Sequence, residues 1–158
     1  MDSNCQLLRH TVATLAYRGG KTLRAAPDRF ADFRAGEGAR TPAQLLAHIG
    51  DLLDWAVALA KGEPEWHNSV PLPWPQEVER FFAALKTFDN YLGSEAPLNA
   101  PPENLFQGPV ADALTHVGQL AMLRRLAGAP IKSENYFRAE ITAGSVGPDQ
   151  VPPRREFD

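Results

Sequence analysis

The sequence predicts an all-α fold: a four-helix bundle with long crossover loops and an irregular C-terminal tail. Four stretches carry apolar residues at helical spacing, proline-rich segments separate them, and no stretch alternates apolar and polar residues as a strand would. The chain has 158 residues, 44% of them hydrophobic and 22% charged, which fits a single globular domain. We expect one domain over residues 1–158, with helices at about 3–26, 42–61, 75–93 and 109–127.

The first predicted helix has leucines at near-helical spacing and is interrupted by Gly19-Gly20. Glycine costs about 1 kcal/mol relative to alanine inside a helix, so we expect the pair to weaken or bend the helix. Pro27 should close it.

The second predicted helix has the clearest boundaries. Thr41 is a favourable N-cap, and Pro42 suits the first helical position, where no amide donor is needed. Leucine, isoleucine and alanine residues then fall on one face together with His48. Gly62 supplies a stop signal after Lys61.

Proline-rich crossovers bracket the third predicted helix. Residues 62–75 contain four prolines, which exclude a regular element, and Trp66 and Trp74 should anchor this loop to the helices. The third helix presents an apolar face that includes Phe81 and Phe88.

The fourth predicted helix begins after a second proline-containing loop and ends before Gly128 and Pro130. Residues 131–158 show no sustained period, so we expect a short helical turn near 134–138 and otherwise irregular structure.

Charge and cysteine content favour a cytoplasmic protein. Sixteen basic residues are interspersed with nineteen acidic ones, and the net charge is −3, so we expect no nucleic-acid partner. Cys5 is the single cysteine, and the first residues do not resemble a secretory signal. No apolar run approaches the roughly 18 residues of a membrane helix, so we expect no membrane partner.

Asp112 and His116 lie four residues apart in the fourth predicted helix, so their side chains project from one side. One helix can offer two ligands to a metal ion in this way. His48 would supply a third ligand from the second helix, leaving a coordination position open for water or substrate. There are structural alternatives. His48 could be a core residue that is hydrogen-bonded to a neighbouring helix, and Asp112 could be a negative charge that stabilises the N-terminus of its own helix.

Four further side chains bear on this candidate site. Gln119, three residues after His116, could support that ligand from behind through a hydrogen bond. His10 is a fallback ligand if it faces the core. We expect His67 to lie exposed in the proline-rich loop, and Asp51 to lie on the solvent side, from which it could still orient His48.

Two stretches carry a resemblance to a known family. They are Thr41-Pro-Ala-Gln-Leu-Leu-Ala-His48-Ile and Gly108-Pro-Val-Ala-Asp112-Ala-Leu-Thr-His116-Val-Gly-Gln119-Leu. With the crossover between them, the chain resembles, over nearly its whole length, the DinB/YfiT-like superfamily of metal-binding four-helix bundles. That superfamily is unrelated to the DNA polymerase of similar name.

The resemblance implies a divalent metal ion held by His48, Asp112 and His116. Zinc or nickel is the common ion in the family, and manganese or iron(II) would also suit two histidines and a carboxylate. Asp112 stands where the family usually has histidine. Relatives include transferases and isomerases that use low-molecular-weight thiols, and they often form homodimers, so a thiol cofactor, a small-molecule substrate and a homodimer are expected.

Two classes of function follow. The first is a divalent-metal-dependent enzyme of the thiol S-transferase or hydrolase type, in which the ion activates a thiol or a water molecule as nucleophile. The alternative is a non-catalytic binding or stress-response bundle whose histidines and aspartate form a structural hydrogen-bond cluster. The sequence assigns no general base and no cofactor-binding residue.

Overall fold

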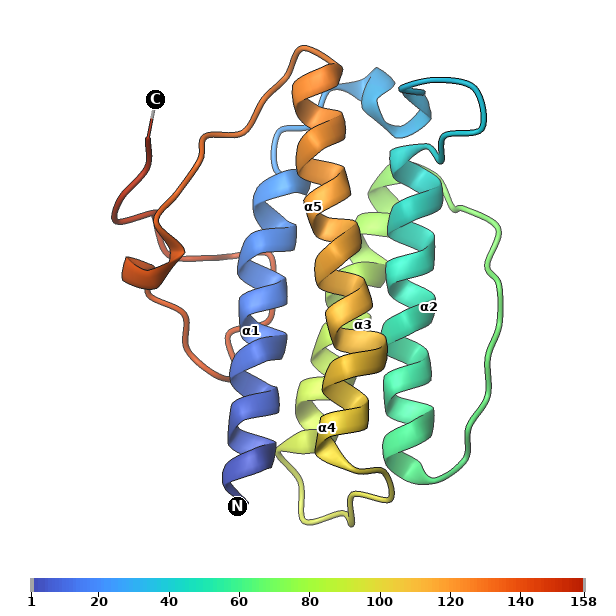
Figure 1. Ribbon diagram of the computed structural model, residues 1–158, viewed down its shortest axis with the longest axis vertical. Helices are drawn as coiled ribbons and strands as arrows, with labels where there is room; N and C mark the ends of the chain where they lie inside the picture. The colour runs from blue at the N-terminus through green and yellow to red at the C-terminus, as the bar shows by residue number, and fades with distance from the viewer. Residues whose placement is uncertain (1, 158) are drawn as a thin grey trace.

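The computed structural model describes residues 2–157 and confirms the all-α bundle (Figure 1). Four long helices pack side by side, and a short helix and a single wide π-helical turn lead into the last of them. The bounds are α1 (Ser3–Leu23), α2 (Pro42–Lys61), α3 (Trp74–Leu92), α4 (Pro102–Leu105), the π turn (Phe106–Val110) and α5 (Ala111–Leu126).

The helices are arranged so that α1 and α2 each pack against both α3 and α5. The connector between α1 and α2 crosses one end of the bundle and contains a 3₁₀ turn at Asp28–Asp32 (Figure 1). Each long helix contributes fully buried apolar side chains to one core, such as Leu15, Ile49, Phe81 and Leu120. Because α2 and α5 are direct neighbours, residues far apart in the sequence face each other across their contact.

α1 continues without a break through Gly19 and Gly20. Both glycines are buried, and a Cβ atom on Gly19 would lie 2.6 Å from Cζ of Phe81 in α3. The missing side chain therefore allows a close approach of α1 and α3. The helix ends at Leu23 rather than at residue 26, since Arg24 is extended and Ala25 has a positive φ of 53°.

The predicted bounds of α2 are confirmed. The hydroxyl of Thr41 accepts a hydrogen bond from the backbone N–H of Gln44, and the Gln44 side-chain oxygen accepts one from the N–H of Thr41. This reciprocal capping box satisfies two amide donors at the start of the helix. At the other end, Gly62 has a φ of 77°, the left-handed conformation in which glycine carries no steric penalty.

The last long helix, α5, begins at Ala111, and the helical stretch that leads into it through α4 and the π turn begins at Pro102, before the predicted start at residue 109. Pro109 lies inside the π turn, where a wider backbone loop accommodates a residue that has no amide donor. Pro102 occupies the first turn of α4, a position that tolerates proline. The π turn ends at Val110, two residues before Asp112, and both the turn and α5 contact α2.

The loops follow the predicted pattern. Residues 63–73 have no regular structure, and Trp74 packs edge to face against Phe30 of the connector. In the tail, a 3₁₀ turn forms at Tyr136–Arg138. Glu134 and Glu156 form an isolated antiparallel β-bridge, which joins the two ends of the tail.

By length and composition, α2 is the one described helix that could cross a membrane, and 67% of its apolar window is buried inside the bundle. Contacts with α3 and α5 account for this apolar character.

Candidate metal centre

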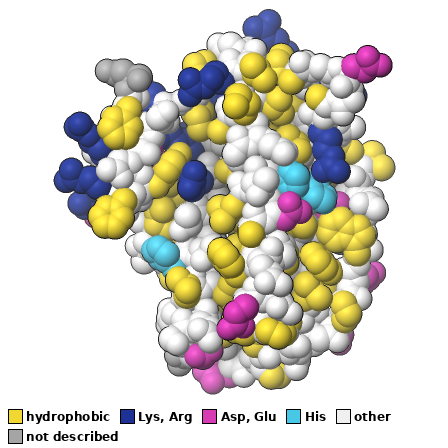
Figure 2. Space-filling model, in the orientation of Figure 1, with side chains coloured by type: hydrophobic (Ala, Val, Ile, Leu, Met, Phe, Trp, Pro, Cys, Tyr) yellow, Lys and Arg dark blue, Asp and Glu magenta, His cyan; other side chains and the backbone are white. Residues whose placement is uncertain are grey.

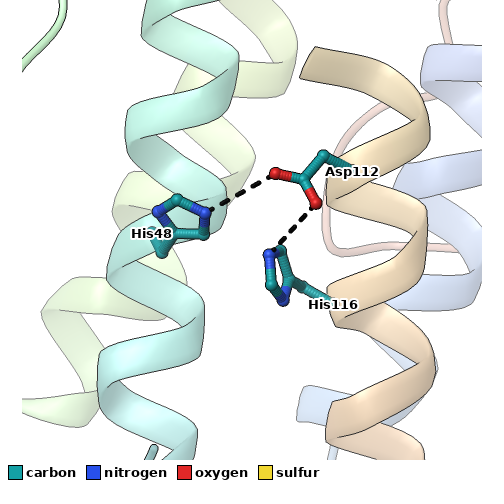
Figure 3. A group of neighbouring side chains, drawn as sticks. All are labelled: His48, Asp112 and His116. Atoms are coloured by element: carbon teal, nitrogen blue, oxygen red, sulfur yellow. Dashed lines mark ion pairs between the residues drawn. The ribbon is translucent and has the colours of Figure 1, made fainter. Parts of the chain in front are cut away.

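The three candidate ligands converge at the contact between α2 and α5. His48 lies in the second turn of α2, and Asp112 and His116 lie in the first two turns of α5. Their side chains point toward one another across the space between the two helices (Figure 3). The four-residue spacing in α5 and the position of His48 on the facing helix together produce this arrangement.

The distances suit a single small cation. Nε2 of His48 lies 3.7 Å from one carboxylate oxygen of Asp112, and Nε2 of His116 lies 3.3 Å from the other. One ligand atom from each residue lies within 4.8 Å of the others. In a tetrahedral zinc site with ligand distances of about 2.0–2.1 Å, neighbouring ligand atoms are roughly 3.3 Å apart. The separations of 3.7 and 3.3 Å between the Asp112 oxygens and the two imidazole nitrogens are close to that spacing.

Gln119 lies beside His116, as the three-residue spacing predicts. Its side-chain oxygen is 2.8 Å from Nδ1 of His116. Because that oxygen only accepts, the contact assigns the proton of a neutral His116 to Nδ1 and leaves a lone pair on Nε2, the nitrogen that faces Asp112. An outer hydrogen bond of this kind fixes both the tautomer and the orientation of a metal-binding histidine.

The electrostatic setting of His48 favours a neutral ring. Burial is the main cause that lowers the pKa of His48, and the nearby His116 and Arg40 lower it further, while Asp112 opposes them. The side chain of His48 is 21% exposed. A neutral imidazole is the form that binds a metal ion, so this pKa direction leaves His48 available as a ligand at neutral pH.

Aromatic side chains enclose one side of His48. The Trp66 ring, from the crossover loop, lies edge to face with the His48 ring at 5.7 Å and also with Trp55 of α2 at 5.7 Å. The rings of His48 and His116 are 4.8 Å apart. The loop between α2 and α3 therefore contributes an apolar wall to the site.

A cavity of about 830 Å³ opens beside the three candidate ligands. Arg40, from the connector that precedes α2, and Leu45, Met122 and Leu126 also line it. Asp112 is 47% exposed, so the cluster is accessible from this cavity. The arrangement combines polar ligand atoms, a cation and apolar walls, as small-molecule sites do.

A second group of potential ligands, Asp51, Asp54 and His67, lies further along α2 and in the crossover loop. Nη2 of Arg80 donates to Asp51 at 2.6 Å and to Asp54 at 3.0 Å, so a guanidinium already occupies the place of a cation. Asp51 also accepts two hydrogen bonds from Ser69 of the loop. These contacts fasten the crossover loop to α2 and α3.

Two predictions about neighbouring residues are wrong. Asp51 is 3% exposed instead of lying on the solvent side, because Arg80 and Ser69 satisfy its carboxylate, and it does not orient His48. His10 is exposed on α1 and does not line the cavity, so it is not a fallback ligand. The prediction that His67 is exposed is confirmed, although its ring also lies 3.2 Å from Asp51.

Sequence reasoning missed Arg40 and the apolar residues Met122 and Leu126 as parts of the site. Arg40 directly precedes the N-cap of α2, and a basic residue there gives no local sign that it faces a histidine two turns later. Met122 and Leu126 extend the spacing that links Asp112, His116 and Gln119 by three- and four-residue steps, which is a signal available from the sequence.

Comparisons of the chain with protein-family models, with curated proteins and with solved structures found no match.

Proposed function

We propose that His48, Asp112 and His116 hold one divalent metal ion and that the protein is a metal-dependent enzyme of the thiol S-transferase or hydrolase type. The observation that carries this proposal is the convergence of two imidazole nitrogens and a carboxylate, from two helices, at the edge of a cavity. Three protein ligands at a cavity leave a coordination position for a non-protein ligand, as in catalytic metal sites.

The donor set fits the proposed ion. Two neutral imidazoles and a carboxylate suit zinc, nickel, manganese or iron(II). His48 has a lowered pKa, and Gln119 directs the free lone pair of His116 toward Asp112. Both features prepare the histidines for coordination without a prior proton loss.

Other residues of the chain would position the ligands and shield the site. Gln119 holds the ring of His116 in place, and Trp66 shields His48 from water on the side of the crossover loop. The cavity receives the substrate next to the ligands. A divalent ion held there would act as a Lewis acid that favours the deprotonated form of a thiol or of water at neutral pH.

The resemblance to the DinB/YfiT-like superfamily supports the same proposal. Under it, the chain is a member in which Asp112 replaces a histidine ligand, a low-molecular-weight thiol is the cofactor, the substrate is a small molecule, and two copies form a homodimer. The four-helix arrangement and the positions of His48 and His116 agree with that membership.

A second function has its own supporting observation. A carboxylate oxygen of Asp112 lies 3.7 Å from Nε2 of His48, and the other lies 3.3 Å from Nε2 of His116. The three residues could therefore act as a hydrogen-bonded cluster that joins α2 to α5 in a non-catalytic binding or stress-response protein.

Metal content separates the two proposals. We expect about one zinc, nickel, manganese or iron ion per chain by mass spectrometry of untagged protein, and none in a His48→Ala/His116→Ala variant. His67→Ala is the matched control, because His67 lies outside the cavity and should leave the content unchanged. If the wild-type protein holds no metal even after reconstitution with each of these ions, the result would favour the hydrogen-bonded cluster.

Activity tests the catalytic part of the proposal. The metal-loaded protein should accelerate transfer of a thiol to an electrophile, or hydrolysis, and His48→Ala should abolish this rate while circular dichroism stays unchanged. A rate retained by folded His48→Ala would remove this site as the centre of catalysis.

A further inference from the structure

The cavity beside the candidate metal centre extends along α5. Its α5 lining includes Asp112, His116, Gln119, Leu123 and Leu126, which follow one another at three- or four-residue steps and therefore share one helix face. At 1.5 Å per residue, this stripe is about 21 Å long. A ligand in the cavity can thus contact the histidines with one end and the end of α5 with the other.

With a divalent ion bound, the histidine end of the cavity would carry an excess of positive charge. Within residues 2–157, the guanidinium of Arg40 forms no hydrogen bond or ion pair, and its charge acts on His48. Asp112 is the one acidic side chain in the cavity lining. With a divalent ion bound, the cations there outnumber this carboxylate. An anionic group on a ligand would reduce their mutual repulsion.

The other part of the cavity is apolar. Met122 and Leu126 on α5 are 57% and 56% exposed, and Leu45 and Ala35 also line the cavity. Figure 2 shows histidine, acidic and basic side chains together on this face, with hydrophobic side chains exposed along α5 toward its C-terminal end. Grouped apolar side chains at a cavity are typical of a ligand site.

We propose that this cavity binds an organic carboxylate with an extended apolar chain, whose carboxylate pairs with Arg40 and whose chain lies along Met122 and Leu126. The inference rests on the proposed function, because it names the class of substrate for the same site. Arginine suits this role because its planar guanidinium can bind a carboxylate through two parallel hydrogen bonds. The apolar wall provides length selectivity, since each buried methylene adds to the binding free energy.

The experiment is calorimetric titration of zinc-reconstituted protein with octanoate. We expect octanoate to bind at least about tenfold more tightly than acetate, which lacks the chain, and than octan-1-ol, which lacks the charge. Arg40→Gln should weaken octanoate binding by about tenfold or more, because it removes a charge-assisted hydrogen bond. Arg29→Gln changes an exposed arginine outside the cavity and should leave binding unchanged.

A second variant tests the apolar wall. Met122→Gln keeps the size of an exposed side chain but adds a polar amide, so it should weaken octanoate binding and leave acetate binding unchanged. Octanoate binding that is absent, or that is equal in wild type and Arg40→Gln, would overturn the inference.

Zinc content, measured on each protein, keeps this test separate from that of the metal centre. Bound zinc with no Arg40-dependent binding of octanoate would overturn the carboxylate site and leave the metal centre standing. Arg40-dependent binding without zinc would support the carboxylate site and remove the metal-dependent function.

Discussion

Gln119 lies one turn beyond His116 on α5 and accepts a hydrogen bond from its Nδ1 atom. We predict that Gln119→Leu lowers zinc affinity by about 10–100-fold, the usual effect of losing an outer hydrogen bond to a metal-binding histidine. Gln119→Glu, which keeps an acceptor at the same place, should retain most of the affinity. Competition with a chromophoric chelator measures the change, and equal affinities of Gln119→Leu and wild type would contradict the role assigned to Gln119.

Single residues also show how far the sequence can predict this site. Asp112, His116 and Gln119 were predictable as a group because all three belong to one helix, whose period determines their relative direction. The burial of Asp51 could not be predicted in this way, because its hydrogen-bond partners are Arg80 on α3 and Ser69 in the crossover loop. Periodicity describes one element, whereas burial of a charged group depends on its partners in others.

The contact between α1 and α3 makes Gly19 and Gly20 a matched pair. A Cβ atom on Gly19 would lie 2.6 Å from Cζ of Phe81, whereas a Cβ atom on Gly20 would lie 3.4 Å from Cζ of Phe82, an ordinary contact. We predict that Gly19→Ala destabilises the protein by about 1–3 kcal/mol through overpacking. Gly20→Ala should be neutral or stabilise it by up to about 1 kcal/mol, because alanine favours the helix.

Urea unfolding followed by circular dichroism measures both alanine variants. The sign of the difference between them tests the packing argument, because helix propensity alone would stabilise both equally. Equal stabilisation by Gly19→Ala and Gly20→Ala would show that α3 can move away from α1 at little cost.

Helix boundaries differ in how much local chemistry determines them. The bounds of α2 were predictable because Thr41, Pro42 and Gly62 each act within their own turn. The start of the last bundle helix was not, because Pro109 has the character of a first helical residue but lies inside a π turn. Packing against the surrounding helices decides whether a π turn or a new helix forms at Pro109. The local sequence therefore cannot predict it.

The crossover loop between α2 and α3 is held by Asp51, which pairs with Arg80 and accepts hydrogen bonds from Ser69. Burial raises the pKa of Asp51, but these hydrogen bonds outweigh it and leave the pKa below its ordinary value. A carboxyl whose pKa is lower in the folded state stabilises the protein above its unfolded-state pKa. This stabilisation is lost as the pH falls through the folded-state pKa.

We therefore predict that Asp51→Asn lowers the free energy of unfolding at pH 7 by about 1.5–3 kcal/mol, the range for hydrogen bonds to charged groups. The difference from wild type should shrink as the pH falls below about 4, where the Asp51 carboxyl of the unfolded chain becomes protonated, and it should vanish once the pH has passed the lower pKa of the folded state. Asp54→Asn is the control: Asp54 contacts the same Arg80 but is 40% exposed, so its effect should be smaller. Urea titrations from pH 7 to pH 3 make the measurement, and a difference that grows toward acid would contradict it.

At the scale of the whole molecule, the tail after α5 returns along the bundle and packs beside α1 (Figure 1). The side chain of Glu134 is fully buried and accepts hydrogen bonds from Tyr17 at 2.6 Å and from Lys21 at 2.8 Å. Glu156 pairs with the same Lys21 at 2.9 Å, but its side chain is 33% exposed. The two glutamates thus contact one ammonium group at nearly equal distances and differ in burial.

Burial decides which of these two ion pairs fastens the tail. Glu134→Ala would leave Tyr17 without its acceptor and remove the buried partner of Lys21, so we predict a loss of about 3 kcal/mol in the free energy of unfolding. Glu156→Ala removes a pair that water already screens, so its loss should be about 1 kcal/mol or less. Urea unfolding compares the two, and proteolysis should cut the tail of Glu134→Ala faster than that of wild type. Equal losses for both variants would mean that the pairing distance, and not burial, determines how strongly the tail is held.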